Sequence, residues 1–168
     1  MTRWPVTGNV RPMAILLIRH GNAGTRANWK GDDQLRPLSN KGLDQARYVA
    51  KLLGDRPIGR LFSSPSLRCV QTIEPLARQL GIDVKTREVF AEGADPERAV
   101  SFLLDRVKHD PAVCAHGDLI PKVIRRLIAT GMRTRDPNLS EKGSVWEIEV
   151  QDGRARSALY LPPGSTKS

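Results

Sequence analysis

The first clear pattern in the chain is an apolar run, residues 13–18, which stops at Arg19-His20-Gly21. Residues 14–18 are hydrophobic without alternation, which predicts a strand buried on both faces, as in a parallel sheet. Gly21 would let the backbone turn sharply or approach a ligand closely. In open α/β sheets, ligands bind just outside the carboxyl ends of the strands. Arg19 and His20 are therefore expected where a ligand site would lie.

Apolar segments and helical periodicities alternate along the rest of the chain. Capping residues, prolines in first turns and apolar spacing predict helices over about 39–53, 64–80, 95–108 and 118–130. Apolar or alternating stretches predict strands at 60–63, 84–90 and 113–115, and a final hairpin of 144–150 and 156–161. Pro75, inside the second helix, predicts a kink or a split. The polar loop 21–38 is long for a compact domain, so it is either functional or disordered.

This order of elements predicts an α/β fold, a three-layer α/β/α sandwich with a mostly parallel central sheet. No internal repeat or linker divides the 168 residues. We expect one domain over 13–161, between a flexible N-terminal arm, 1–12, and a frayed tail, 162–168.

Composition excludes several classes of protein. The chain is 39% hydrophobic and has no run near the roughly 18 apolar residues of a membrane span. Residues 1–12 lack the apolar core of a signal peptide, so we expect a cytoplasmic protein without a membrane partner. Cys69 and Cys114 have no metal-type spacing and are expected to be buried free thiols.

The formal net charge of +9 indicates either attraction to anions or a generally basic surface. The anion could be a phosphorylated small molecule or a nucleic acid. However, the sequence has no Lys/Arg block interleaved with aromatic residues, and only 5% of residues are aromatic. Nucleic acid is therefore not an expected partner.

Polar side chains follow three of the predicted strands. Arg19 and His20 end the first, Arg68 lies in the first turns of the helix after the second, and His116 ends the strand at 113–115. Because these ends lie at one edge of a parallel sheet, the four side chains are expected to converge. A neutral imidazole can attack phosphorus, and guanidinium forks match phosphoryl oxygens. The pattern predicts His20 as a nucleophile in a phosphate pocket.

Four ordered stretches resemble one known family. Leu17-Ile18-Arg19-His20-Gly21 is similar to the signature of the histidine phosphatase (phosphoglycerate-mutase-like) superfamily. Residues 63–72 resemble its second-arginine segment and Ala115-His116-Gly117 its second-histidine segment. Residues 33–42, followed by Gln45-Ala46, resemble the SixA-like branch. The resemblance spans about 14–150.

The resemblance implies roles for particular residues. His20 would carry the phosphoryl group, Arg19, Arg68 and His116 would bind it, and no metal or cofactor would be required. Members that need a proton donor take an acidic residue from the segment after the third strand. Glu92 is the best match here, and Glu88 is the second.

Two positions depart from the mutases of this family. They carry Glu where this chain has Asn22, and Asn where it has Arg26. The resemblance therefore favours a phosphohydrolase over a mutase, with Asn22 as a further candidate phosphate ligand.

Within the family, the chain most resembles the C-terminal histidine-phosphatase domain of actinobacterial MutT-type Nudix hydrolases, without a Nudix domain. The shared features include Lys30-Gly31-Asp32-Asp33, Arg36-Pro37-Leu38 and Lys142-Gly143-Ser144. The implied substrates are a phosphohistidine protein or a small phosphomonoester or nucleotide. The alternative is the terminal phosphate of a nucleoside diphosphate, including oxidised nucleotides, for which Trp29 is the candidate aromatic wall.

Two other classes of function stay open. The chain could be a catalytically silent module that binds phospho-ligands. It could also be a metal hydrolase using His20, His116 and either Asp118 or Glu92. The second is disfavoured because the sequence has no paired histidines at helical spacing.

Overall fold

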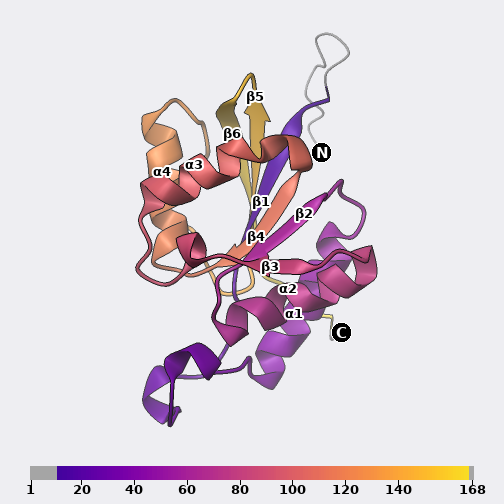
Figure 1. Cartoon of the computed structure of the whole chain (residues 1–168), viewed down its shortest axis with the longest axis vertical. Coiled ribbons are helices and arrows are strands. Elements are labelled where there is room, and N and C mark those ends of the chain that lie inside the picture. Colours follow the sequence, from indigo (N-terminus) through magenta and orange to yellow (C-terminus); the bar gives the residue numbers. More distant parts are fainter. Residues whose placement is uncertain (1–10, 167–168) are drawn as a thin grey trace.

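The fold is a six-stranded sheet with helices on both faces (Figure 1), seen in a computed structural model that describes residues 11–166. The strands are β1 (Met13–Arg19), β2 (Arg60–Ser63), β3 (Val84–Thr86), β4 (Pro111–Ala115), β5 (Val145–Gln151) and β6 (Arg154–Leu161). The helices are α1 (Asn40–Leu53), α2 (Leu67–Leu80), α3 (Pro96–Asp105) and α4 (Leu119–Ala129). Short 3-10 turns are η1 (Arg26–Asn28), η2 (Asp33–Leu35), η3 (Glu88–Phe90) and η4 (Val107–His109). The predicted α/β class is confirmed.

The strand order is β3-β2-β4-β1-β5-β6. The first four strands in this order are mutually parallel, whereas β5 and β6 form an antiparallel hairpin beside β1. In the register of β1 with β4, Arg19 pairs with Ala115. His20 follows Arg19 and His116 follows Ala115, so both histidines lie just beyond the same edge of the sheet.

β1 lies at the centre of two hydrophobic layers, as its unbroken apolar run predicts. Leu16 and Ile18 pack on the side of α1 and α2. Ile15 and Leu17 pack on the side of α3 and α4. All four side chains are buried. This double burial fixes the strand that ends at Arg19, and so fixes the position of His20.

Three predicted elements differ in the structure. α2 is not split at Pro75 but runs from Leu67 to Leu80, because its buried face packs on the sheet and on α1. The strand predicted over 84–90 ends at Thr86, since its partner β2 ends at Ser63 and leaves no further ladder to extend. Residues 88–90 form η3 instead. The helix predicted to 108 ends at Asp105 and is followed by η4.

The loop 21–38 folds into η1 and η2 rather than remaining irregular. Arg36, which is buried, donates from Nη1 to the carbonyl of Ala23 at 2.8 Å and from Nε to Asp33 at 3.0 Å. Where the loop joins α1, the backbone N–H of Ser39 donates to the carbonyl of Asn22 at 2.9 Å. These bonds give the loop a fixed path beside the carboxyl end of β1.

Most of the predicted arm, 1–12, lies outside the described residues, which begin with Arg11 paired to Asp110. The predicted tail is described as far as residue 166. There the hydroxyls of Ser165 and Thr166 donate to Asp44 of α1. Cys69 and Cys114 are buried free cysteines, as predicted. None of the helices within 11–166 is long and apolar enough to cross a membrane.

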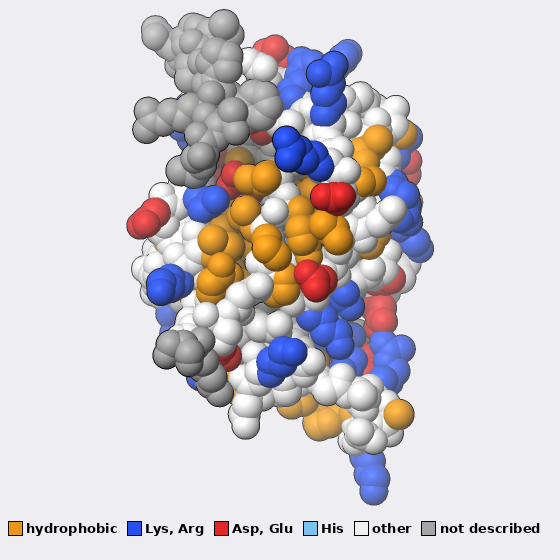
Figure 2. Space-filling model, turned by 180° about the vertical axis from the view of Figure 1, so that it is seen from behind, with side chains coloured by type: hydrophobic (Ala, Val, Ile, Leu, Met, Phe, Trp, Pro, Cys, Tyr) orange, Lys and Arg blue, Asp and Glu red, His pale blue; other side chains and the backbone are white. Residues whose placement is uncertain are grey.

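Figure 2 shows the face turned away from the viewer in Figure 1, where hydrophobic side chains gather and Lys and Arg stand around them. Leu139 and Leu159 are among the exposed hydrophobic residues of the chain. Both line a groove of about 740 Å³ along β5 and β6. This groove is separate from the edge of the sheet where His20 lies.

Candidate active site

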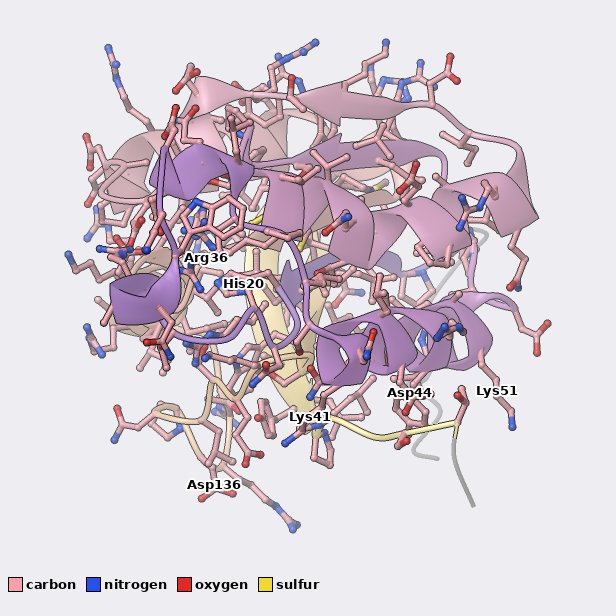
Figure 3. All side chains as sticks on the ribbon, turned by 90° about the horizontal axis from the view of Figure 1, so that it is seen from below. His20, Arg36, Lys41, Asp44, Lys51 and Asp136 are labelled. Carbon is pink, nitrogen blue, oxygen red and sulfur yellow. The ribbon has the colours of Figure 1, made fainter. Side chains whose placement is uncertain are left out.

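A cavity of about 380 Å³ opens at the carboxyl ends of β1 and β4. It contains Arg19, His20, Arg68, His116 and Glu92, each of which the sequence had indicated as a candidate site residue. The other lining residues are Gly24, Thr25, Arg26, Arg36, Gly117, Asp118 and Lys142. His20 and Arg36 are labelled in Figure 3. His20 directly follows β1 and Arg36 lies in the loop before α1, and both line this cavity.

His20 is held by bonds on both its backbone and its ring. Its backbone N–H donates to the carbonyl of Ala115 at 3.1 Å, which ties it to β4. Its Nδ1 lies 2.8 Å from the carbonyl of Gly21. A carbonyl only accepts, so Nδ1 carries the proton and the lone pair of the neutral ring is on Nε2. The ring therefore has the tautomer that a nucleophile needs.

The charge state of His20 follows from its burial. Burial lowers the pKa of His20 to about 3, helped by the positive charges of Arg68 and Arg19 and by His116, against the opposing bond to Gly21. Burial has this effect because an imidazolium loses its hydration inside the protein. At neutral pH the ring is therefore neutral and its Nε2 lone pair is available.

Arg19 crosses the cavity from the end of β1. One terminal nitrogen donates to the carbonyl of Ser140. A Cβ at Gly117 would lie 2.5 Å from Cζ of Arg19, so the glycine leaves room for the guanidinium to pass. Burial lowers the pKa of Arg19, yet a guanidinium keeps its charge in proteins.

Arg68 reaches the cavity from the first turn of α2 and is almost fully buried. Its Nη1 donates to the backbone carbonyl of Asp33 at 2.8 Å. Its Nη2 lies 3.2 Å from the Asp33 carboxylate and 3.3 Å from that of Glu92. Both terminal nitrogens of Arg68 are thus bound by acceptors from Asp33 and Glu92.

The Nε atoms of Arg19 and Arg68 are buried, and neither has a hydrogen-bond partner within residues 11–166. Buried N–H donors are normally paired, because leaving one unpaired costs about 1–3 kcal/mol. Both side chains line one cavity with a neutral imidazole. The arrangement suits an anion with several acceptor oxygens, such as a phosphoryl group.

His116 stands edge-on to His20, with ring centroids 5.4 Å apart and an angle of 69° between the planes. Its Nε2 lies 2.7 Å from Oγ of Ser64 and 3.6 Å from Sγ of Cys69. The second histidine is therefore fixed by the junction between β2 and α2, the same segment that supplies Arg68.

The two acidic side chains of the cavity are already engaged. Glu92 pairs with Nη2 of Arg26 at 2.7 Å in addition to Arg68. Asp118 accepts from the backbone N–H of Gly93 at 2.7 Å. Glu88, the second candidate proton donor, lies in η3 and is not among the residues that line the cavity.

Asn22 lies beside the cavity rather than in its lining. Its side-chain oxygen accepts from the hydroxyl of Ser39 at 2.7 Å and from the backbone N–H of Gly24 at 3.1 Å. Its backbone N–H donates to Gln45 at 2.7 Å. These contacts join the loop to the start of α1.

Sequence reasoning did not single out three further cations of the cavity, Arg26, Arg36 and Lys142. Burial lowers the pKa of Lys142, and nearby positive charges, Arg19 first among them, add to this effect. Arg36 and Lys142 lie in stretches that resemble the family, so their place in those motifs could have indicated a role in the site. Arg26 lies in none of these motifs and was named only as a departure from the mutases.

The residues proposed for a metal hydrolase do not form a metal site. Within residues 11–166, no three His, Cys, Asp or Glu side chains are grouped as ligands for one ion. His20 and His116 meet ring edge to ring face, and Asp118 turns to the backbone of Gly93. The donor set instead combines two imidazole rings with guanidinium groups.

Residues 15–94 match the histidine phosphatase superfamily (branch 1). The chain is 33% identical over 158 residues, 91% of its length, to an 8-oxo-(d)GTP phosphatase of Mycolicibacterium smegmatis. This chain belongs to branch 1 of the histidine phosphatase superfamily. Over 82 residues it is also 34% identical to the phosphohistidine phosphatase SixA of Escherichia coli, covering 48% of each chain.

This branch 1 chain spans about half the length of these curated relatives, 49% of the M. smegmatis protein and 48% of SixA. Among solved structures, it resembles the protein histidine phosphatase SixA complexed with tungstate, with a TM-score of 0.73 and 20% identity. That likeness covers 91% of this chain and 97% of the other, so the two proteins share their fold over most of both chains.

Proposed function

We propose that this chain is a metal-independent phosphohydrolase that moves a phosphoryl group from its substrate to Nε2 of His20 and then to water. One observation carries the proposal. Two buried guanidinium Nε–H donors, from Arg19 and Arg68, lack partners within residues 11–166 beside an imidazole that is neutral at pH 7. Family membership supports the same chemistry.

In the first step, the Nε2 lone pair of His20 attacks phosphorus and the bond to the leaving group breaks, with its electron pair going to that group. Arg19 and Arg68 bind the phosphoryl oxygens, where negative charge is concentrated. In the second step, water attacks the phosphohistidine and releases inorganic phosphate and the neutral ring. The carbonyl of Gly21 keeps the proton on Nδ1 throughout.

The substrate we propose has a leaving group that needs little help from an acid. The carboxyl oxygens of Glu92 are engaged by Arg26 and Arg68 as acceptors, rather than placed to donate a proton to a leaving group. Phosphohistidine on a protein meets this requirement, because a neutral imidazole is a good leaving group. The likeness to SixA, which is named a phosphohistidine phosphatase, supports this SixA-like substrate.

The second candidate is a nucleoside diphosphate that loses its terminal phosphate. The cations of the cavity lining outnumber its two carboxylates, Glu92 and Asp118, which suits a ligand with more than one phosphate; they are Arg19, Arg26, Arg36, Arg68 and Lys142. The similarity to a protein named 8-oxo-(d)GTP phosphatase also favours it. Trp29 does not line the cavity and donates to the carbonyl of Asp32, so recognition of a base would rest on other residues.

The mechanism is tested with His20→Ala, assayed on an aryl phosphate, with the folded state checked by circular dichroism. We expect turnover to fall by a factor of about 10³ or more, because the nucleophile is lost. His109→Ala, on a histidine outside the cavity, is the matched control and should keep its activity. Activity of His20→Ala near that of the wild type would refute the mechanism.

Substrate choice is tested with a panel of phosphohistidine protein, nucleoside diphosphates and sugar phosphates. The highest kcat/KM should fall on phosphohistidine protein, with nucleoside diphosphates second. A preference for nucleoside diphosphates would select the second candidate. Saturable binding of inorganic phosphate without hydrolysis of any substrate would identify the chain as a silent binding module.

A further inference from the structure

Ser64 is a buried residue between β2 and α2 whose hydroxyl faces His116. Its Oγ lies 2.7 Å from Nε2 of His116. Both residues are almost fully buried. The distance shows a hydrogen bond but leaves open which atom donates, because a hydroxyl and a neutral imidazole can each play either role.

The other bonds of Ser64 decide the direction. The backbone N–H of Ser66 donates to Oγ of Ser64 at 3.3 Å and occupies one of its lone pairs. Within residues 11–166, the acceptor within reach of the Ser64 hydroxyl proton is Nε2 of His116. If Nε2–H donated instead, either to Oγ of Ser64 or to Sγ of Cys69 at 3.6 Å, the hydroxyl proton of Ser64 would be buried without an acceptor, which is unfavourable.

The backbone holds this pair in register. The backbone N–H of Ser64 donates to the carbonyl of Cys114 at 2.9 Å, two residues before His116. The backbone of Ser64 is therefore tied to β4, the strand that ends directly before His116.

We propose that Ser64 is a positioning residue that fixes the tautomer of His116. The Ser64 hydroxyl donates to Nε2, so the proton of the neutral ring stays on Nδ1. The ring edge at Nε2 is turned toward Ser64 and Cys69, and His116 lines the cavity beside His20.

The consequence for the reaction rests on the proposed phosphohydrolase function. With the proton on Nδ1, His116 presents an N–H donor to a phosphoryl oxygen. The opposite tautomer would present a lone pair, which repels an anionic oxygen. Ser64 would then act on the reaction without touching the substrate, in the way that residues behind a metal ligand orient that ligand.

The first measurement needs no variant. Two-dimensional ¹⁵N–¹H NMR of the wild-type protein at pH 7 distinguishes the two imidazole tautomers, and His116→Gln identifies the signals of His116. We expect His116 to be protonated on Nδ1. Protonation on Nε2 in the wild type would overturn the proposal, whatever the activity of the protein.

The second measurement compares Ser64→Ala, Ser64→Thr and Ser63→Ala. Ser63 is the matched control, because its hydroxyl is equally buried but bonds to a backbone carbonyl. We expect Ser64→Ala to lower kcat on an aryl phosphate by about 10- to 100-fold, with a smaller change in KM. The His116 signals should shift toward a mixture of tautomers. Ser64→Thr keeps a hydroxyl and should restore both readouts.

The outcomes separate this inference from the proposed function. Unchanged kcat and an unchanged tautomer in Ser64→Ala would overturn the role of Ser64, while loss of activity in His20→Ala would still support the mechanism. Conversely, a wild type without phosphatase activity would refute the proposed function, and the Nδ1 tautomer would still be measured. Equal losses of kcat in Ser63→Ala and Ser64→Ala would indicate general damage to the β2–α2 junction and refute the specific role.

Discussion

Asp33 binds Arg68 twice, through its backbone carbonyl at 2.8 Å from Nη1 and through its carboxylate at 3.2 Å from Nη2. The same carboxylate pairs with Arg36 at 3.0 Å and with Arg26 at 3.3 Å. One acidic side chain thus holds three guanidinium groups that would otherwise repel one another. Burial raises the pKa of Asp33, but the bond from Arg36 and the charges of these arginines outweigh it and leave the pKa below its usual value.

We expect Asp33→Asn to lower kcat/KM by about tenfold, because the Arg68 guanidinium loses the charged contact that fixes its plane. Removing a negative charge would also favour phosphate binding, but the Asp33 side chain is 30% exposed and its field is screened by water. Direct contact with Arg68 should therefore dominate.

Steady-state kinetics and inhibition by inorganic phosphate measure the Asp33 effect. Asp32→Asn, on the neighbouring carboxylate that caps η2, is the matched control. Unchanged kcat together with tighter phosphate inhibition in Asp33→Asn would mean that Asp33 competes with the substrate for Arg68.

Arg68→Lys keeps the positive charge but removes Nε–H and the planar fork. We expect kcat/KM to fall by about 100-fold, because one ammonium cannot bind Asp33 and a phosphoryl oxygen in the same geometry. Arg78→Lys, an exposed position on the same helix, is the control for the substitution itself. If the two variants were equally active, Arg68 would contribute charge alone.

The lowered pKa of His20 predicts how stability depends on pH. Unfolded His20 takes up a proton near its ordinary pKa of about 6.5, whereas folded His20 does so near 3. Between these values the unfolded state binds more protons, so the free energy of unfolding falls as the pH falls, by up to about 1.4 kcal/mol per pH unit.

His20→Asn removes this contribution. Between pH 6 and pH 5, urea unfolding of the wild type should lose about 1 kcal/mol more stability than the variant loses. His109→Asn controls for the loss of a histidine elsewhere. Parallel curves for the wild type and His20→Asn would show that folded His20 titrates near its ordinary pKa.

Glu92→Gln tests whether this carboxyl donates a proton. Because Glu92 is held by Arg26 and Arg68, we expect its loss to lower kcat by a similar factor, about three- to tenfold, for alkyl and aryl phosphates. A general acid would instead matter far more for the poor alkyl leaving group. Much greater loss on alkyl phosphates would assign Glu92 as the proton donor.

The sequence was sufficient to predict the sheet edge at which the site lies. The unbroken apolar run of β1 and the short run of β4 both end in histidine, and parallel strands bring such ends together. This reasoning places His20, His116 and Arg68 without knowledge of any side-chain contact, and the structure brings all three into one cavity.

Contacts between side chains far apart in the chain could not be predicted in this way. Asp33 lies 35 positions from Arg68, and Arg26 lies 66 positions from Glu92. Such pairs depend on the path of the loop 21–38, which follows no periodicity. The end of β3 was missed for a similar reason, since a strand extends only as far as its partner allows.

The direction of β5 has a consequence for how this pocket could diversify. β5 runs opposite to β1, so the segment entering β5 meets the chain where it leaves β1: Gly143 N–H donates to the carbonyl of Arg19, and Ser144 accepts from the Arg19 N–H. The segment that leads into β5, residues 131–142, therefore supplies Lys142 to one wall of the cavity. His20, His116 and Arg68 come from other parts of the chain. The same segment also holds Arg19, whose guanidinium donates to the carbonyl of Ser140, so it lines the cavity and positions one of the cavity arginines at the same time. A change in the length of residues 131–142 would therefore alter the shape of the cavity and the place of Arg19 together, while His20, Arg68 and His116 stay on their own elements.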